Sequence, residues 1–223
     1  MAITIGGTGI TFGNLGVQAT KFDSTTETGG IINITSFTAS GTWTKPSGCT
    51  SVLVQVVGGG GGAAGYCESG GAGGYCEKVI DVTAVSTVAV TIGGGGASVG
   101  YYAASNDGGT SSFGSFCSAT GGYGANRNNS HSGGHGGLGS SGNVNLSGGI
   151  GTGHTNNAGH WPGAMGGASF FGSSGTVSRA TTSTKLYNGA PGSGGPGGRT
   201  NDGIGAVGVA NGESGLIIVY AYK

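Results

Sequence analysis

The chain has 223 residues, of which 57 are glycine, and eight basic residues balance eight acidic residues. Charged residues make up only 7%, so no positive field attracts phosphates, and we expect no nucleic-acid partner. Leu, Ile, Val and Phe together make up just under a fifth of the residues, a share as low as in disordered chains. The high net charge of such chains is missing, so we do not expect a random coil. No apolar run is long enough for membrane insertion, and the start MAITIGGTG does not resemble a signal peptide.

The apolar residues gather in short runs that are rich in β-branched side chains and mostly bounded by Gly or Ser. These runs are Ile31–Phe37, Ser51–Val57, Cys76–Val82, Thr87–Ile92 and Leu216–Tyr222. No segment shows helical periodicity, and glycine costs about 1 kcal/mol per interior helix position relative to alanine. We therefore predict an all-β fold without α-helix. Residues 37–57, 76–92 and 215–222 should form a sandwich-like antiparallel β frame, with Trp43 and Pro46 packed at its edge.

Glycine makes up about 30% of the residues from Gly58 to Gly215, yet this region is anchored by strands at both ends and keeps aromatic residues throughout. Glycines recur there at a spacing of three, in sets such as Gly133, Gly136, Gly139 and Gly142. Three residues per turn is the period of the polyproline-II-type helix, which has no internal hydrogen bonds. The spacing suggests packed polyglycine-II helices bonded to one another. Ordinary glycine-rich loops with chance spacing are the alternative.

Candidate chemical groups are few. Four histidines, His131, His135, His154 and His160, lack the spacing and the neighbouring Cys or carboxylate of a zinc site, so we predict no metal and no cofactor. Four cysteines, Cys49, Cys67, Cys76 and Cys117, permit disulfides such as a Cys67–Cys76 staple, although free thiols are favoured. No nucleophile elbow, phosphate-binding loop or facing pair of carboxylates is visible, so we do not expect an enzyme.

Five ordered pieces of sequence resemble a known family. The run 41–62, GTWTKPSGCTSVLVQVVGGGGG, combines an aromatic–proline turn, a valine strand and a glycine burst. It is followed by GGAGGY at 70–75, VAVTIGGGG at 88–96, GGTSSFG at 108–114 and GLIIVY at 215–220. Together these pieces, over residues 37–222, resemble the glycine-rich domain of bacteriophage tail-fibre and tail-tip proteins. The chain is also similar to the tip adhesins of T-even-type long tail fibres.

The resemblance implies a virion protein of a tail fibre or tail tip, which works outside the cell and recognises a host cell-surface glycan or outer-membrane receptor without catalysis. It divides the chain into an N-terminal attachment and trimerisation segment, residues 1–36, and a glycine-rich tip domain, residues 37–223. The N-terminal segment is too short to bury its own apolar residues, so we predict a homotrimer joined to the fibre shaft or another virion protein. A single copy capping a trimeric shaft is the alternative. Two other functions stay open, an ice-binding or other polyglycine-helix surface protein and a depolymerising tailspike tip.

A binder with so little charge should use aromatic rings and short polar side chains on loops that a rigid scaffold holds. Sugars suit such loops, because their C–H faces stack on rings while their hydroxyls bond to Asn, Ser and Tyr. Phe113, Phe116, Phe170 and Phe171 are instead expected to fill gaps between layers of polyglycine helices. The predicted receptor-binding residues, with Tyr102 and Trp161 as exposed anchors, are Tyr101, Tyr102, Asn106, Tyr123, Asn126, Asn128, His154, His160, Trp161 and Tyr187.

Overall fold

The computed structural model describes residues 3–6, 9–12, 30–65, 68–99, 103–125, 132–153, 164–175, 177–178, 185–186, 189–198 and 208–223. These residues contain strands and no helix, so none of them belongs to a helix that could cross a membrane. The all-β prediction is confirmed. The strands are β1 Ile3–Gly6, β2 Gly9–Phe12, β3 Ile31–Phe37, β4 Gly41–Thr44, β5 Ser51–Val57, β6 Tyr75–Asp81, β7 Thr87–Thr91, β8 Ser111–Phe113, β9 Cys117–Ala119, β10 Gly139–Ser140, β11 Val144–Leu146, β12 Val177–Ser178, β13 Lys185–Leu186 and β14 Leu216–Tyr222.

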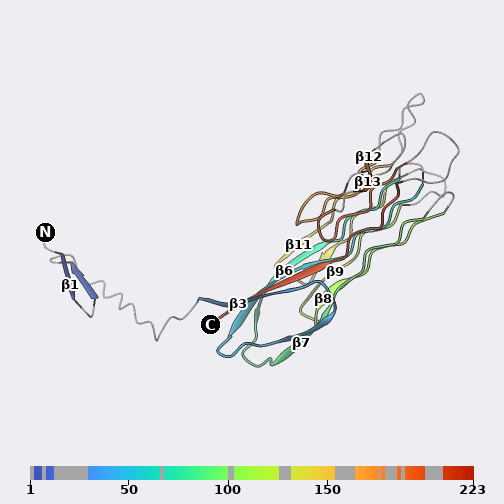
Figure 1. Ribbon diagram of the computed structural model, residues 1–223. Helices are drawn as coiled ribbons and strands as arrows, with labels where there is room; N and C mark the ends of the chain where they lie inside the picture. The colour runs from blue at the N-terminus through green and yellow to red at the C-terminus, as the bar shows by residue number, and fades with distance from the viewer. Residues whose placement is uncertain are drawn as a thin grey trace.

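Ten of these strands form two five-stranded antiparallel sheets (Figure 1). The long sheet has the order β11-β6-β5-β14-β3, and the short sheet has the order β10-β9-β8-β7-β4. The final strand β14 lies between β5 and β3, with Val219 opposite Val54. This pairing of 216–222 with 51–57 confirms the predicted frame and closes the glycine-rich region onto the strand from which it starts.

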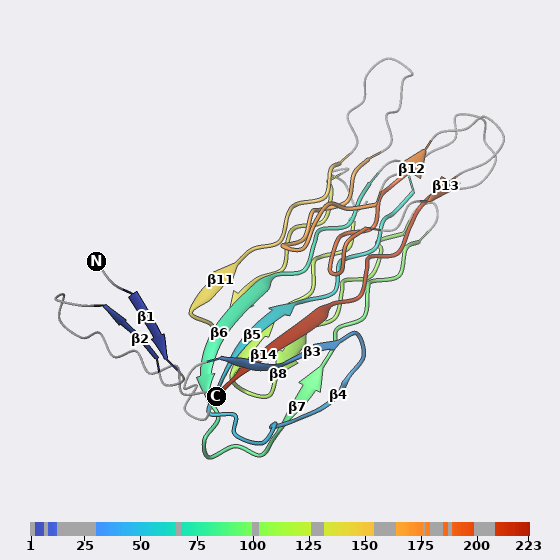
Figure 2. The ribbon, with the colours of Figure 1, turned by 60° about the vertical axis from the view of Figure 1, so that its left-hand side comes forward.

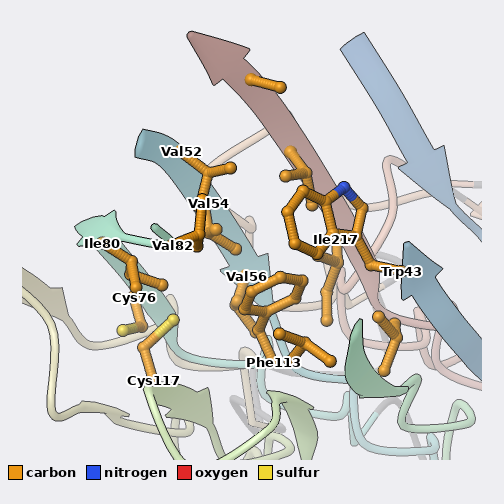
Figure 3. Packing of buried hydrophobic residues seen from close by; sticks show 14 of the residues in the cluster. Trp43, Val52, Val54, Val56, Cys76, Ile80, Val82, Phe113, Cys117 and Ile217 are labelled. Carbon is orange, nitrogen blue, oxygen red and sulfur yellow. The ribbon is translucent and has the colours of Figure 1, made fainter. Parts of the chain in front are cut away.

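The two sheets enclose one apolar core, which Figure 3 shows from close by. Period-two alternation turns Val52, Val54 and Val56 of β5 inward, where all three are fully buried. Trp43, predicted at the edge of the frame, lies on the edge strand β4 but is only 2% exposed, and its ring meets Phe113 edge to face at 5.7 Å. The valine strand and the tryptophan turn thus supply the two halves of the core.

Three of the four cysteines lie among the described residues, and all three are free, buried thiols, as the sequence favours. Cys76 of β6 and Cys117 of β9 face one another across the core (Figure 3). A Cys67–Cys76 staple is absent from this structure because Cys76 is free, while Cys67 itself lies outside the described residues.

Beyond the strands, long extended segments run side by side away from the sheets (Figures 1 and 2). The segment 58–64, which continues β5, shows how they are joined. Its consecutive N–H groups donate to the carbonyls of Gly74, Gly109, Glu213, Gly71, Asn106, Ala210 and Glu68. Every third acceptor belongs to the same neighbour, so the N–H groups turn in rotation to three segments, 68–74, 106–109 and 210–213.

The carbonyl groups of this central segment follow the same rotation toward three further neighbours. Residues 59–63 accept, in order, from the N–H groups of Gly122, Gly96, Gly195, Ala125 and Val99. The segment 58–64 is therefore bonded to six surrounding segments. The N–H groups of residues 69–74 show the same period, since they donate in order to Thr152, Gly195, Tyr123, Gly149, Gly192 and Thr120.

Burial repeats with the same period of three. Along 132–138, Ser132, His135 and Leu138 are exposed, whereas Gly134 and Gly137 are buried. The segments 58–64 and 68–75 are buried at every position. The bundle of glycine-rich segments therefore has central members that touch neighbours on all sides and outer members that show one face in three to solvent.

Close approach of these backbones explains the glycine content. A Cβ atom on Gly61 would overlap the backbone carbonyl of Tyr123, and one on Gly60 would overlap the carbonyl of Ser193. A Cβ on Gly94, at the surface of the bundle, would meet no atom within 4 Å. Glycine is therefore required by the neighbouring backbone at Gly60 and Gly61, and it is not sterically required at every central or outer position, as Ala63 and Gly94 show.

We predict that Gly61→Ala lowers the free energy of unfolding by about 3 kcal/mol or more, because backbone rather than a flexible side chain occupies the space of the new methyl. Gly94→Ala is the matched control. It should change the free energy of unfolding by less than about 1 kcal/mol, because it adds a methyl in open space and restricts the unfolded chain. Urea titration followed by circular dichroism measures both. Equal effects of the two variants would contradict the close-packed arrangement.

Trp43→Ala should cost about 3–5 kcal/mol in the free energy of unfolding, since it empties the space against Phe113. Val79→Ala, at a position 62% exposed on the outside of the long sheet, should stay within about 0.5 kcal/mol of the unchanged protein. Thermal and urea unfolding test both. A Trp43 variant as stable as the Val79 variant would show that the core does not depend on this ring.

Candidate functional site

Five connections leave the glycine-rich bundle at one end. The residues that flank them are bonded to one another around the end of the central segment. Val99 N–H donates to Ala63, and Ala125 N–H donates to Gly62, at 3.0 and 3.1 Å. Ala64 N–H donates to Glu68 at 2.9 Å, and Ala63 N–H donates to Ala210. The connections 66–67, 100–102, 126–131 and 199–207 therefore start or end close together.

The connection 154–163 belongs to the same end. Ser69 N–H donates to Thr152 at 3.1 Å, and Ala164 and Gly197 form a reciprocal antiparallel bridge. The Ser69 hydroxyl also accepts from the Gly197 N–H at 3.1 Å. Segments that are distant in sequence thus bring five connections to one end of the molecule, which we call the loop end.

The chain enters and leaves the domain at the sandwich, away from the loop end. Lys223 N–H donates to Gly30 at 3.2 Å, so the last residue lies beside the residue that precedes β3. Between this point and the loop end lie the two sheets and the full length of the bundle (Figure 2). An attachment through the N-terminal residues would leave the loop end pointing away from it.

Most predicted receptor-binding residues fall on connections outside the described residues. These are Tyr101, Tyr102, Asn126, Asn128, His154, His160, Trp161 and Tyr187. All but Tyr187 belong to connections whose flanking residues meet at the loop end. Asn106 and Tyr123 are described, and both are exposed on outer segments of the bundle, Tyr123 at 56%.

Tyr123 borders a hollow of about 340 Å³ just inside the loop end. Its other lining side chains include Ser105, Asp107, Ser132 and His135. Tyr123 and His135 lie on neighbouring segments, because the Tyr123 N–H donates to the His135 carbonyl at 2.9 Å. The hollow therefore gathers side chains from both sides of the connection 126–131 and from the residues after 100–102.

Hydrogen bonds fix the floor of this hollow. The Asp107 carboxylate accepts from the Gly124 N–H at 2.8 Å, and the Ser105 hydroxyl donates to the Gly62 carbonyl at 2.7 Å. Since Gly62 lies in the fully buried central segment, the hollow rests on the most constrained part of the bundle. An exposed phenol ring, an imidazole and a carboxylate surround it, which is a set that can stack on and bond to a small polar ligand.

The approach of His135 to Tyr123 is a feature that the sequence analysis missed. The two residues are twelve positions apart, and only the hydrogen-bonded register of two extended segments brings them together. The recurrence of a non-glycine residue at every third position, at Ser132, His135 and Leu138, is the sequence signal that could have placed His135 on an outer face. Among the described residues, no three His, Cys, Asp or Glu side chains come together as a metal site would require.

The predicted role of the phenylalanines as gap fillers between glycine-rich segments does not hold for Phe113, which is fully buried in the sandwich core against Trp43, and it is wrong for Phe170, which is 51% exposed. Phe116 and Phe171 are partly buried. The Phe170 ring stacks on Tyr75 with centroids 3.7 Å apart, and Phe171 meets both rings edge to face. Phe170 is exposed because this cluster sits on the outside of the long sheet, where nothing among the described residues covers it.

Among known families, the model of a glycine-rich domain matches residues 35–222 of the chain. A search of curated proteins found no similar chain. The matched range spans the short sheet, the bundle of glycine-rich segments and the long sheet except for residues 31–34 of β3. This chain therefore belongs to the glycine-rich domain family.

Proposed function

We propose that the protein is a tip adhesin of a bacteriophage tail fibre, which binds a host cell-surface receptor without catalysis. The observation that carries the proposal is the polarity of the molecule. The chain enters at the sandwich, and five connections leave at the opposite end. A fibre tip needs this arrangement, with attachment at one pole and recognition at the other. The resemblance of residues 37–222 to tail-fibre and tail-tip domains supports the same function.

The glycine-rich segments serve as a rigid scaffold in this proposal. We infer that they are polyglycine-II helices, because their hydrogen bonds and their burial repeat every three residues. At a rise of about 3.1 Å per residue, the seven residues 58–64 carry the connections roughly 20 Å beyond β5. Bonds to six neighbours limit bending of this scaffold, so receptor-contacting side chains lose little further freedom on binding.

The proposed ligand is a neutral glycan of the host surface. The hollow at the loop end offers the exposed Tyr123 ring and short polar residues such as Ser132, and its Asp107 carboxylate is already bonded to the Gly124 N–H. Sugar rings suit such a surface because they combine apolar C–H faces with many hydroxyls. An outer-membrane protein is the alternative receptor class. The virion partners in this proposal are the fibre shaft, joined through residues 1–36, and two further copies of the chain in a homotrimer.

Replacing Tyr123 with Ala should weaken binding to host cells by about tenfold or more, since the variant removes an exposed ring of the candidate surface. Trp161→Ala tests the predicted anchor in the same assay. Thr42→Ala on the short sheet is the control, and it should bind as the unchanged protein does because Thr42 lies at the opposite pole. The measurement is flow cytometry of labelled full-length protein on a panel of bacterial strains. It is repeated with lipopolysaccharide that has been stripped from the same strains and added as a competitor.

Loss of binding by both loop-end variants, with the fold retained, supports an adhesin whose contacts lie at the loop end. Competition by the stripped lipopolysaccharide identifies a glycan, whereas competition only by outer-membrane protein selects the alternative receptor class. If the unchanged protein binds no strain of the panel, or if both variants bind as well as the unchanged protein, the proposal is wrong.

A further inference from the structure

The outer faces of the two sheets differ sharply in chemistry. On the short sheet the outward residues are small and mostly polar, with Thr42 paired to Ala89 and Thr91 paired to Ser112. On the long sheet one row crosses four strands with Ile34, Tyr220, Leu53 and Val79 side by side. Both faces belong to one sandwich, so the contrast lies in their outward side chains and not in the fold.

We call the row Ile34, Tyr220, Leu53 and Val79, together with Ile218, the apolar face. Ile34 is 57% exposed and Val79 is 62% exposed, although cross-strand neighbours cover part of each. The cross-strand pairing makes these side chains one contiguous apolar patch rather than scattered residues, and contiguous exposed patches mark sites of association. The face carries no charge among its members and includes a tyrosine, which is the composition found at the centre of protein interfaces.

Charge begins at the margin of the apolar face, on β6. The Glu77 carboxylate accepts from the Tyr75 hydroxyl at 2.7 Å and from the Gln55 amide at 2.9 Å. These hydrogen bonds hold the pKa of Glu77 below its usual range, so this rim is negatively charged at neutral pH. A polar rim around an uncharged centre is the usual arrangement of an interface.

The edge of the same sheet has no blocking residue in its own strand. β3 is the edge strand, and its sequence IINITSF contains no charged residue and no proline. Edge strands of monomeric proteins are normally blocked by such residues, because their free N–H and C=O groups pair with other chains. Ile31, Ile32 and Ile34 of this strand are all exposed.

We propose that the apolar face and the β3 edge form the contact between copies of this chain in the homotrimer. The location of the N-terminal residues favours a second copy as the partner. They enter at Gly30, directly beside β3, and their hairpin pairs Ile3 with Phe12 and Ile5 with Ile10. A lone two-stranded hairpin is marginally stable, so its apolar residues favour association with other copies of the same hairpin, and in each copy β3 is the first strand of the sandwich after this hairpin. The uncharged face presents no repulsion between identical copies.

This inference rests on the proposed homotrimer and names its surface. The test is light scattering of the full chain at about 10 µM, a concentration at which a specific oligomer should persist. The unchanged protein should have the mass of a trimer. Ile34→Lys, and separately Val79→Lys, should give monomers, because a lysine on the face would be buried without a partner. The control variants are Thr42→Lys and Ala89→Lys, at two paired positions on the outside of the short sheet. Both should still form the trimer.

Circular dichroism and thermal unfolding establish that each variant is folded, and having two face positions keeps the test open if one variant fails to fold. A monomeric unchanged protein would overturn the inference and leave the face to a different protein. Trimeric Ile34→Lys and Val79→Lys variants would overturn it as well. A trimer that binds no host cell would instead contradict the proposed adhesin function, because the two readouts are independent.

Discussion

Six neighbours around one extended backbone leave no space for a side chain at Gly58 to Gly62, and the rest of the structure depends on this constraint. Residues 58–64 donate to three segments and accept from three others, so every direction around the segment is occupied by another backbone. A Cβ at Gly59, Gly60 or Gly61 would overlap a neighbouring carbonyl group. The run of glycines after β5 is thus required because other backbones pack against this segment on all sides. It replaces a hydrophobic core with hydrogen bonds, which satisfies the polar backbone groups that such burial would otherwise leave unpaired.

Hydrogen bonds between extended segments do not fix register by themselves, and the sandwich supplies that register. The central segment 58–64 continues β5, and the central segment 68–74 leads directly into β6. These two strands pair residue by residue, from Ser51 opposite Asp81 to Val57 opposite Tyr75. The valine core holds those strands, so the glycine-rich segments leave the sheets already aligned. The final strand β14 closes the arrangement, because its partners on both sides are already in place. The connections at the loop end then inherit a fixed base although they lie far from any apolar core.

The strands with clear β-branched runs were predictable from the sequence, because a seven-residue run such as LIIVYAY has no competing interpretation. The short strands β8, SSF, and β9, CSA, were not predicted, since three residues rich in Ser become a strand only through their partners. The glycine spacing indicated a period of three. The spacing did not show that the unbroken glycine run after β5 forms the centre of the bundle, while the spaced glycines at Gly133 and Gly136 belong to an outer segment. Only the hydrogen-bond partner of each N–H group shows which segment is central.

The candidate site was predictable to a lesser degree. Rings and amides between glycine runs indicate surface connections, and Tyr123 is exposed as expected. Its meeting with His135 and Asp107 depends on the register between segments, which no local pattern encodes. Phe170 escaped prediction for a related reason. A pair of phenylalanines in a glycine-rich region suggests packing between segments, whereas this pair lies over Tyr75 on the outside of a sheet.

The most direct test of the account is to identify the acceptors of three consecutive amides by nuclear magnetic resonance, through scalar couplings across hydrogen bonds. The account predicts couplings from Gly59 N to the carbonyl carbon of Gly109, from Gly60 N to that of Glu213, and from Gly61 N to that of Gly71. Three successive amides would then point to three different segments. Couplings of alternate amides to a single partner, as in a sheet, or rapid solvent exchange of all three would contradict it.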